Sequence, residues 1–220
     1  MTSPRSHRSR ASRTCRVAKT AAAAEAIGKI ERGSDVFVLT YGQFSLIDAL
    51  MAILDQVGPA DVSISTWTAA DAHLERTAAL LASANIRSFR MIVDRSFPTR
   101  QPGYCHHMLE LFGEDAIRLI RTHAKFMLIR SDTHDVVCRT SMNLNENPRL
   151  ENIEVSEDRG LAEFFQGVVD GVWSEVAAGE VRSALPALDG MAEASMFKRV
   201  RAGTIRREAL NEPETTHVVG

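Results

Sequence analysis

Cysteine, aromatic residues and long apolar runs are all scarce in this chain of 220 residues. The three cysteines, Cys15, Cys105 and Cys138, are widely spaced, and none forms the C-x-x-C pair that zinc sites use. Their odd number predicts no disulfide framework and favours a reducing compartment, so we expect a cytoplasmic protein. No apolar run approaches the ~18 residues of a membrane span, and the alanines at 21–24 end at Glu25, so we expect no signal peptide and no stable membrane insertion.

Charge is distributed unevenly, although the net charge is only −2. Residues 1–19 contain arginines and a lysine but no acid, with much serine and threonine, and this composition predicts a disordered arm. Such an arm fits a nucleic-acid contact, an organelle transit peptide or an incidental soluble tail, and the sequence leaves these open. We therefore expect the basic arm with a short helix at 1–33, one folded domain at 34–178 and a C-terminal tail at 179–220.

The apolar pattern predicts alternating strands and helices, followed by several strands in close succession and a last amphipathic helix. The predicted strands span 35–41, 62–67, 86–93, 116–120, 123–130, 136–141 and 152–155, and the predicted helices span 20–32, 44–57, 70–83, 104–112 and 161–177. This order predicts an α/β fold with a mixed β-sheet flanked by helices on both faces.

Two short polar motifs lie within the run of successive strands. His123 and Lys125 are two residues apart, as are Ser141 and Asn143, and side chains two apart on a strand share a face. If the two strands pair through a turn at 131–135, the four polar groups converge on one spot. For the first pair alone, the plain alternative is a half-exposed strand with its polar side chains in solvent.

The stretch at 121–155 resembles the signature of the phospholipase D superfamily, which combines H-x-K with a later S-x-N. Here the first half is intact at His123 and Lys125, and the second is intact at Ser141 and Asn143. The order of predicted elements also agrees with one phospholipase D-like lobe, so the resemblance extends over most of the predicted domain.

The resemblance implies a reaction and a role for each residue. His123 would attack a phosphodiester and form a phosphohistidine that water then hydrolyses. Lys125 and Asn143 would hold the non-bridging oxygens, and Ser141 would add a hydroxyl donor. Glu151 is the expected carboxylate that fixes the imidazole in one tautomer. No metal or other cofactor is needed, because lysine and asparagine supply the electrostatic stabilisation.

The family uses two such motifs, because a second histidine protonates the leaving group. No other histidine of this chain is followed by a lysine two residues later. The resemblance therefore implies a homodimer in which two copies of His123 face each other across a twofold axis.

Several further residues are weaker candidates for substrate contact. Arg130 stands where the family carries an aspartate, and both Arg130 and Arg149 could reach a phosphate or be solvated. Tyr41 and Gln43 follow a predicted strand, where crevices of α/β sheets form. Trp67 could stack on a base, although the sequence favours a place in the core.

We therefore expect a metal-independent phosphodiesterase, a small dimeric nuclease acting on DNA or RNA. One alternative is a lipid phosphodiesterase of the phospholipase D type, although no apolar docking segment is visible. Another is a catalytically weakened DNA-binding or scaffold protein with the same fold. Arg130, in place of the aspartate, and Thr140, in place of a glycine before the serine, motivate this last alternative.

Overall fold

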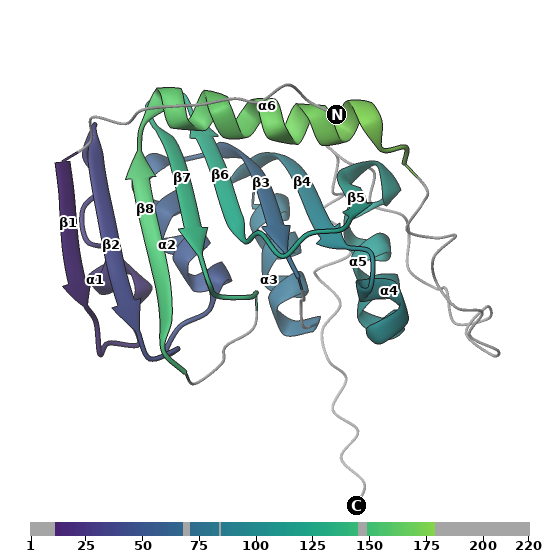
Figure 1. Cartoon of the computed structure of the whole chain (residues 1–220), viewed down its shortest axis with the longest axis horizontal. Coiled ribbons are helices and arrows are strands. Elements are labelled where there is room, and N and C mark those ends of the chain that lie inside the picture. Colours follow the sequence, from purple (N-terminus) through teal and green to yellow (C-terminus); the bar gives the residue numbers. More distant parts are fainter. Residues whose placement is uncertain (1–11, 68–70, 84, 145–148, 179–220) are drawn as a thin grey trace, which may run out of the picture.

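Eight strands form one mixed sheet in the order β1-β2-β8-β7-β6-β3-β4-β5 (Figure 1). The computed structural model describes residues 12–67, 71–83, 85–144 and 149–178. The strands are β1 Ser12–Val17, β2 Ser34–Thr40, β3 Ala60–Thr66, β4 Ile86–Asp94, β5 Ile117–Ile120, β6 Phe126–Ser131, β7 Asp135–Thr140 and β8 Glu151–Glu157. The helices are α1 Ala23–Ile27, α2 Leu46–Val57, α3 Asp71–Ala82, α4 Phe97–Arg100, α5 Pro102–Phe112 and α6 Arg159–Glu175, with a 3-10 turn at Glu114–Ala116.

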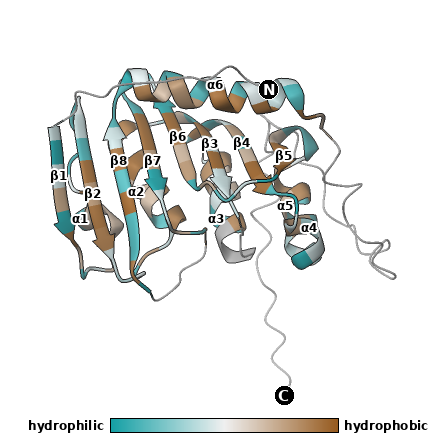
Figure 2. Cartoon of the chain, viewed as in Figure 1, coloured by the Kyte–Doolittle hydropathy of each residue, from teal (hydrophilic) through white to brown (hydrophobic). Residues whose placement is uncertain are grey.

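Helices cover both faces of the sheet, which confirms the predicted α/β architecture. Helices α1, α2, α3 and α5 lie behind the sheet in the view of Figure 1, and α6 lies on the other side. Strand residues alternate between the two layers: Met127 and Ile129 belong to the large core, whereas Leu128 packs with Leu161 and Ala162 of α6. Figure 2 shows the apolar residues concentrated in the central strands.

Helix α2 begins at a capping box and ends at a glycine. Ser45 accepts a hydrogen bond from the backbone N–H of Asp48, and the carboxylate of Asp48 accepts one from the backbone N–H of Ser45 at 2.8 Å. Arg76 of α3 adds an ion pair to the same carboxylate at 2.5 Å. Gly58, with φ at 78°, ends the helix in a conformation that a side chain would strain.

The segment expected to be a disordered arm contains a strand. Residues Ser12–Val17 form β1, which pairs in parallel with β2 at one margin of the sheet. Arg13 anchors this strand through Asp35 at 2.8 Å and Glu154 at 2.6 Å. The disorder prediction is therefore wrong for these six residues, because sheet pairing and ion pairs replace the apolar pattern that the sequence lacks.

Strand direction divides the sheet into two ends. Strands β1 to β5 and β7 finish at one end, where β6 and β8 begin, because β6 and β8 are antiparallel to their neighbours. We call this the carboxyl end and the opposite one the amino end. In Figure 1 the carboxyl end is the lower one. Crevices at the carboxyl ends of parallel strands are the usual place for ligands in open α/β sheets.

Candidate functional site

His123 and Lys125 lie in the loop that enters β6 at the carboxyl end, and not on the strand itself. The strand begins at Phe126, because the carbonyl of Ala124 accepts a hydrogen bond from Ser65 Oγ at 2.8 Å instead of joining the sheet ladder. His123 is exposed and Lys125 is half-buried. Lys125 Nζ lies 3.5 Å from His123 Nδ1, so the two side chains still come together, as predicted.

Ser141 also lies just outside its predicted strand, because β7 ends at Thr140. Its hydroxyl donates to a carboxylate oxygen of Glu151 and accepts the backbone N–H of Asn152 at 3.0 Å. The backbone N–H of Thr140 bonds the carbonyl of Lys125 at 3.1 Å, which ties the start of β6 to the end of β7. The serine hydroxyl is therefore already committed to holding the first residue of β8.

Glu151 is buried at this end of the sheet, with an exposed fraction of only 5%. One of its oxygens accepts the Ser141 hydroxyl, and the other accepts Arg149 Nε at 2.5 Å. Neither oxygen bonds His123 within the described chain. The carboxylate thus holds Ser141 and Arg149, and its charge acts on Lys125, whereas the resemblance implies a contact with the imidazole.

Three competing effects act on the pKa of Lys125. Burial lowers the pKa of its ammonium group most, the negative charge of Glu151 raises it, and the positive charge of Arg149 lowers it again. The net pKa lies below the ordinary value of 10.5. A partly desolvated cation with a reduced pKa gains more from an incoming anion than a fully hydrated lysine does.

Of the remaining predicted residues at the carboxyl end, Tyr41 and Gln43 have structural contacts of their own. Asn143 is half-buried, and its Oδ1 has no hydrogen-bond partner among the described residues. Tyr41 follows β2 beside the start of β8, is 46% exposed and lies under Lys19 Nζ, which is 5.7 Å from its ring centroid. Gln43 Oε1 accepts the backbone N–H of Tyr41, so this carboxamide stabilises the turn.

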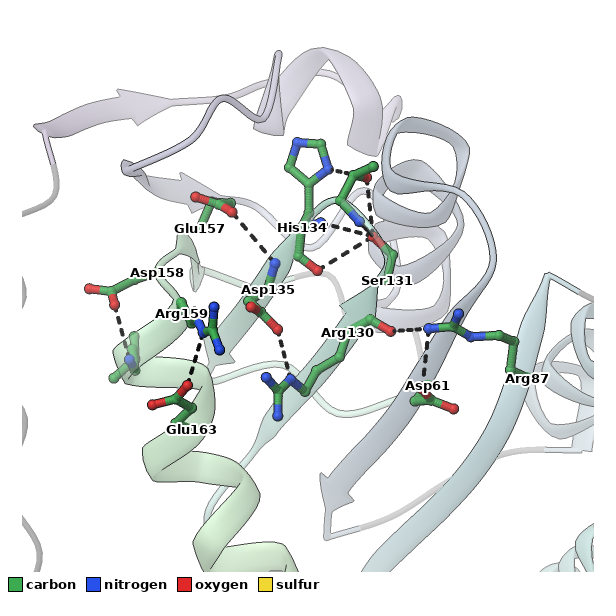
Figure 3. Close-up of polar contacts among 12 residues, drawn as sticks. Asp61, Arg87, Arg130, Ser131, His134, Asp135, Glu157, Asp158, Arg159 and Glu163 are labelled. Carbon is green, nitrogen blue, oxygen red and sulfur yellow. Dashed lines mark hydrogen bonds and ion pairs between the residues drawn. The ribbon is translucent and has the colours of Figure 1, made fainter.

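Arg130 is separated from this group, because it lies near the end of β6, at the amino end of the sheet. Figure 3 shows its guanidinium beside Asp135 on the neighbouring strand, with a Nε–Oδ1 distance of 2.7 Å. It lines a cavity of about 620 Å³ between α6 and strands β3, β4 and β6. The guanidinium groups lining that cavity already pair with carboxylates, among them Arg87 with Asp61 at 3.2 Å. The structure therefore does not bring Arg130 to the predicted site.

Trp67, which the sequence indicated as a weak candidate for base stacking, lies beside the histidine, together with Asp94 and Arg100, which the sequence did not indicate. The ring centroids of Trp67 and His123 are 5.7 Å apart, and Arg100 Cζ lies 3.8 Å above the Trp67 ring. Asp94 accepts the backbone N–H of Thr122, next to the histidine, at 3.0 Å. Their positions in the sequence could have pointed to the site, because Trp67 and Asp94 lie at the ends of two neighbouring parallel strands.

Other classes of site find less support in the part of the chain that the structure describes. These residues contain no group of three or more histidine, cysteine or acidic side chains placed to hold a metal ion. His106 and His107 contact glutamates along and beside α5, at 3.3 Å and 3.9 Å. Cys15, Cys105 and Cys138 are free thiols. No described helix is both long and apolar enough to cross a bilayer.

No family model and no curated protein matches the sequence. Among solved structures, the chain is similar to Nuc from Salmonella typhimurium, a phospholipase D family member, with 19% identity and a TM-score of 0.43 over 59% of this chain and 90% of that one. It is also similar to NucT from Helicobacter pylori, with 14% identity and a TM-score of 0.47 over 66% of this chain and 99% of that one.

A third similar structure is TrmBL2, an archaeal chromatin protein, with 9% identity and a TM-score of 0.42 over 68% of this chain and 55% of that one. Identities and TM-scores this low assign the chain to no family. What the residues at the carboxyl end can do therefore has to be argued from their own geometry.

Proposed function

We propose that this chain is a metal-independent phosphodiesterase that cleaves nucleic acid through a covalent intermediate on His123 and acts as a homodimer. One observation carries the proposal: an exposed imidazole lies 3.5 Å from the ammonium group of Lys125 at the carboxyl end of the sheet. This contact is too long to be a strong hydrogen bond, so the cation remains able to bind an anion. A nucleophile and an anion-binding group therefore lie next to each other at the carboxyl end of the sheet.

The proposed reaction has two displacements at phosphorus. A ring nitrogen of His123 attacks the phosphorus atom, and the bond to the leaving oxygen breaks as a second histidine donates a proton to that oxygen. Water then attacks the phosphorus atom, the second histidine takes a proton from that water, and the phosphorus–nitrogen bond breaks, which frees the phosphate and restores the imidazole. Lys125 and Arg149 stabilise the negative charge that develops on the non-bridging oxygens.

A polyanionic substrate is supported by the charges at the carboxyl end. Basic residues gather where strands begin or finish there: Lys19, Arg95, Arg100, Arg121, Lys125 and Arg149. Two carboxylates at this end, Asp94 and Glu151, already accept hydrogen bonds from the protein. Cations spread over such a width suit a chain of phosphates, whose binding releases condensed counterions.

The test is cleavage of labelled single- and double-stranded DNA and of RNA in the presence of EDTA. Wild type should cut at least one substrate, and His123→Ala should abolish the cleavage. His134→Ala is the matched control, because His134 lies in the hairpin at the amino end and its loss should leave the rate unchanged (Figure 3). Equal cleavage by wild type and His123→Ala would refute the proposal. Headgroup release from liposomes without cleavage of nucleic acid would favour the lipid alternative.

The dimer is proposed because no described contact joins His123 to a second histidine that could protonate the leaving group. The His123 ring lies against Trp67, His106 and His107 contact glutamates, and His134 lies in the hairpin at the amino end of the sheet. Sedimentation of the active protein should therefore give twice the chain mass of 24.2 kDa. A monomer with full activity at the assay concentration would contradict this part of the proposal.

A further inference from the structure

The backbone on both sides of His123 is held by side chains from neighbouring strands. The N–H of Thr122 donates to Asp94 Oδ2 at 3.0 Å, and the carbonyl of Ala124 accepts Ser65 Oγ at 2.8 Å. Ser65 is almost fully buried, with 1% exposure, so its hydroxyl is a rigid anchor. The position of the histidine Cα is therefore fixed by β3 and β4, although the loop itself has no regular structure.

The second oxygen of Asp94 extends these contacts to α4. Asp94 Oδ1 accepts the backbone N–H of Ser96 at 2.9 Å and also the Ser96 hydroxyl. Burial raises the pKa of the Asp94 carboxyl, but the hydrogen bonds from Ser96 and Thr122 and the positive charge of Arg100 outweigh it, so the net pKa is lowered. The aspartate is thus ionised at neutral pH and can hold the loop and the helix together.

Arg100 connects this corner to the imidazole ring. Its Nε donates to Ser96 Oγ at 3.0 Å, and its guanidinium lies over the Trp67 ring, with Cζ 3.8 Å from the ring centroid. The indole in turn lies 5.7 Å from the imidazole of His123, centroid to centroid, with 54° between the planes. The contacts therefore form a closed circuit that starts at the backbone beside His123 and returns to its ring.

We propose that Asp94, Arg100 and Trp67 are positioning residues that hold the His123 ring in the orientation needed to attack the substrate. The kinetic part of this inference rests on the proposed function, whereas the ring contact itself does not. Attack on phosphorus requires a nitrogen lone pair aligned within a narrow angle, and small misplacement of a reacting group costs ~10²-fold in rate. Trp67 therefore acts through the histidine and does not stack on a nucleobase of the substrate.

Steady-state kinetics distinguish a positioning role of Trp67 from direct contact with the substrate. Trp67→Leu should lower kcat ~10- to 100-fold with little change in KM, because substrate binding keeps its phosphate contacts. Arg90→Ala removes a comparable cation–π contact at Trp173, 5.2 Å from Arg90 Cζ, and should leave both constants unchanged. A rise in KM with kcat unchanged would overturn the inference and assign Trp67 to the substrate. No change in either constant would also overturn it.

Tryptophan fluorescence tests the contact without any assay of activity. Trp67 and Trp173 are the two tryptophans of the chain, so Trp173→Phe leaves Trp67 as the single emitter. Because the Trp67 and His123 rings are in contact, replacing the imidazole should alter the Trp67 emission. The emission of Trp173→Phe should therefore change with His123→Gln added, and it should stay the same with His134→Gln added.

Arg100→Ala in the same background should weaken the histidine-dependent change, because the indole loses the guanidinium that holds it. An unaltered His123-dependent difference in emission would overturn the inference. If Trp173→Phe does not fold, the difference in emission between wild type and His123→Gln gives the same information. Should wild type cleave no substrate, the proposed function fails, and the fluorescence result alone decides whether this circuit orients the histidine.

Discussion

Replacing Glu151 with glutamine should lower the free energy of unfolding and move the alkaline limb of the activity profile to lower pH. The carboxylate is 5% exposed and accepts charge-assisted hydrogen bonds from Ser141 and Arg149. A neutral amide keeps the serine bond in weakened form, at a cost of ~1 kcal/mol. It also turns the half-exposed Arg149 pair into a poor contact, at a cost of up to ~1 kcal/mol after solvent screening. The expected loss of unfolding free energy is therefore ~1–2 kcal/mol.

The pH effect follows from the charges around Lys125. Glu151 is the one influence that raises the Lys125 pKa, against burial and Arg149, which lower it. Without that carboxylate, the lysine pKa falls further below 10.5, so the ammonium group loses its proton at a lower pH. If Lys125 binds the substrate phosphate, the alkaline limb of the rate profile should move to lower pH in the variant.

Urea unfolding measures the first effect, and initial cleavage rates across alkaline pH measure the second. Glu154→Gln is the matched control on the same strand, since Glu154 pairs with Arg13 at 2.6 Å and Arg139 at 3.3 Å. It should lose similar stability and leave the rate profile in place. Unchanged stability in Glu151→Gln, or an alkaline limb that moves to higher pH, would refute the reasoning.

Two further predictions concern the fold. Burial raises the pKa of Asp48, but the hydrogen bonds from Ser45 and the ion pair with Arg76 outweigh burial and lower this pKa below 3.8. The ionised carboxylate therefore stabilises the fold above that pH, and this stabilisation disappears as the pH falls through the folded-state pKa. Urea unfolding of Asp48→Asn should show a loss of ~1–2 kcal/mol at neutral pH that vanishes in acid, and a constant difference would contradict this. A thiol reagent should modify exposed Cys15 at once, but Cys105 and Cys138 only on unfolding, because burial raises their pKa values, that of Cys105 to about 12. More than one fast thiol would contradict the fold.

Apolar periodicity predicted most of the sheet and helices, because most of these elements bury one face. The helix expected at 44–57 is present as Leu46–Val57, and the four strands after α5 follow in the predicted order. The exception is β1, whose sequence has no apolar alternation and whose six residues are all exposed. Its pairing depends on Asp35 and Glu154, which are distant in the sequence, so local patterns could not reveal it.

The site was predictable in its location, but less so in its contacts. The spacing of His123 and Lys125 identified the pair, yet it suggested a strand, because the alternation of side chains continues into β6. Glu151 contacts Arg149, two residues before it, and Ser141, which follows β7, and the motif spacing revealed neither contact. Asp94 ends β4 and Arg100 ends the short helix α4, and neither belongs to a motif, so their proximity to the histidine emerges only from the fold.

The replacement of the expected aspartate by Arg130 bears little on the proposed chemistry. At ~3.3 Å per residue, position 130 lies ~16 Å along β6 from Lys125, at the amino end of the sheet. Arg130 pairs in register with Asp135 of β7, and the two side chains form an ion pair at 2.7 Å. The arginine thus stabilises the hairpin end rather than the reacting groups. The alternative of a catalytically weakened scaffold protein therefore depends on the residues at the carboxyl end, where His123, Lys125 and the buried Glu151 lie.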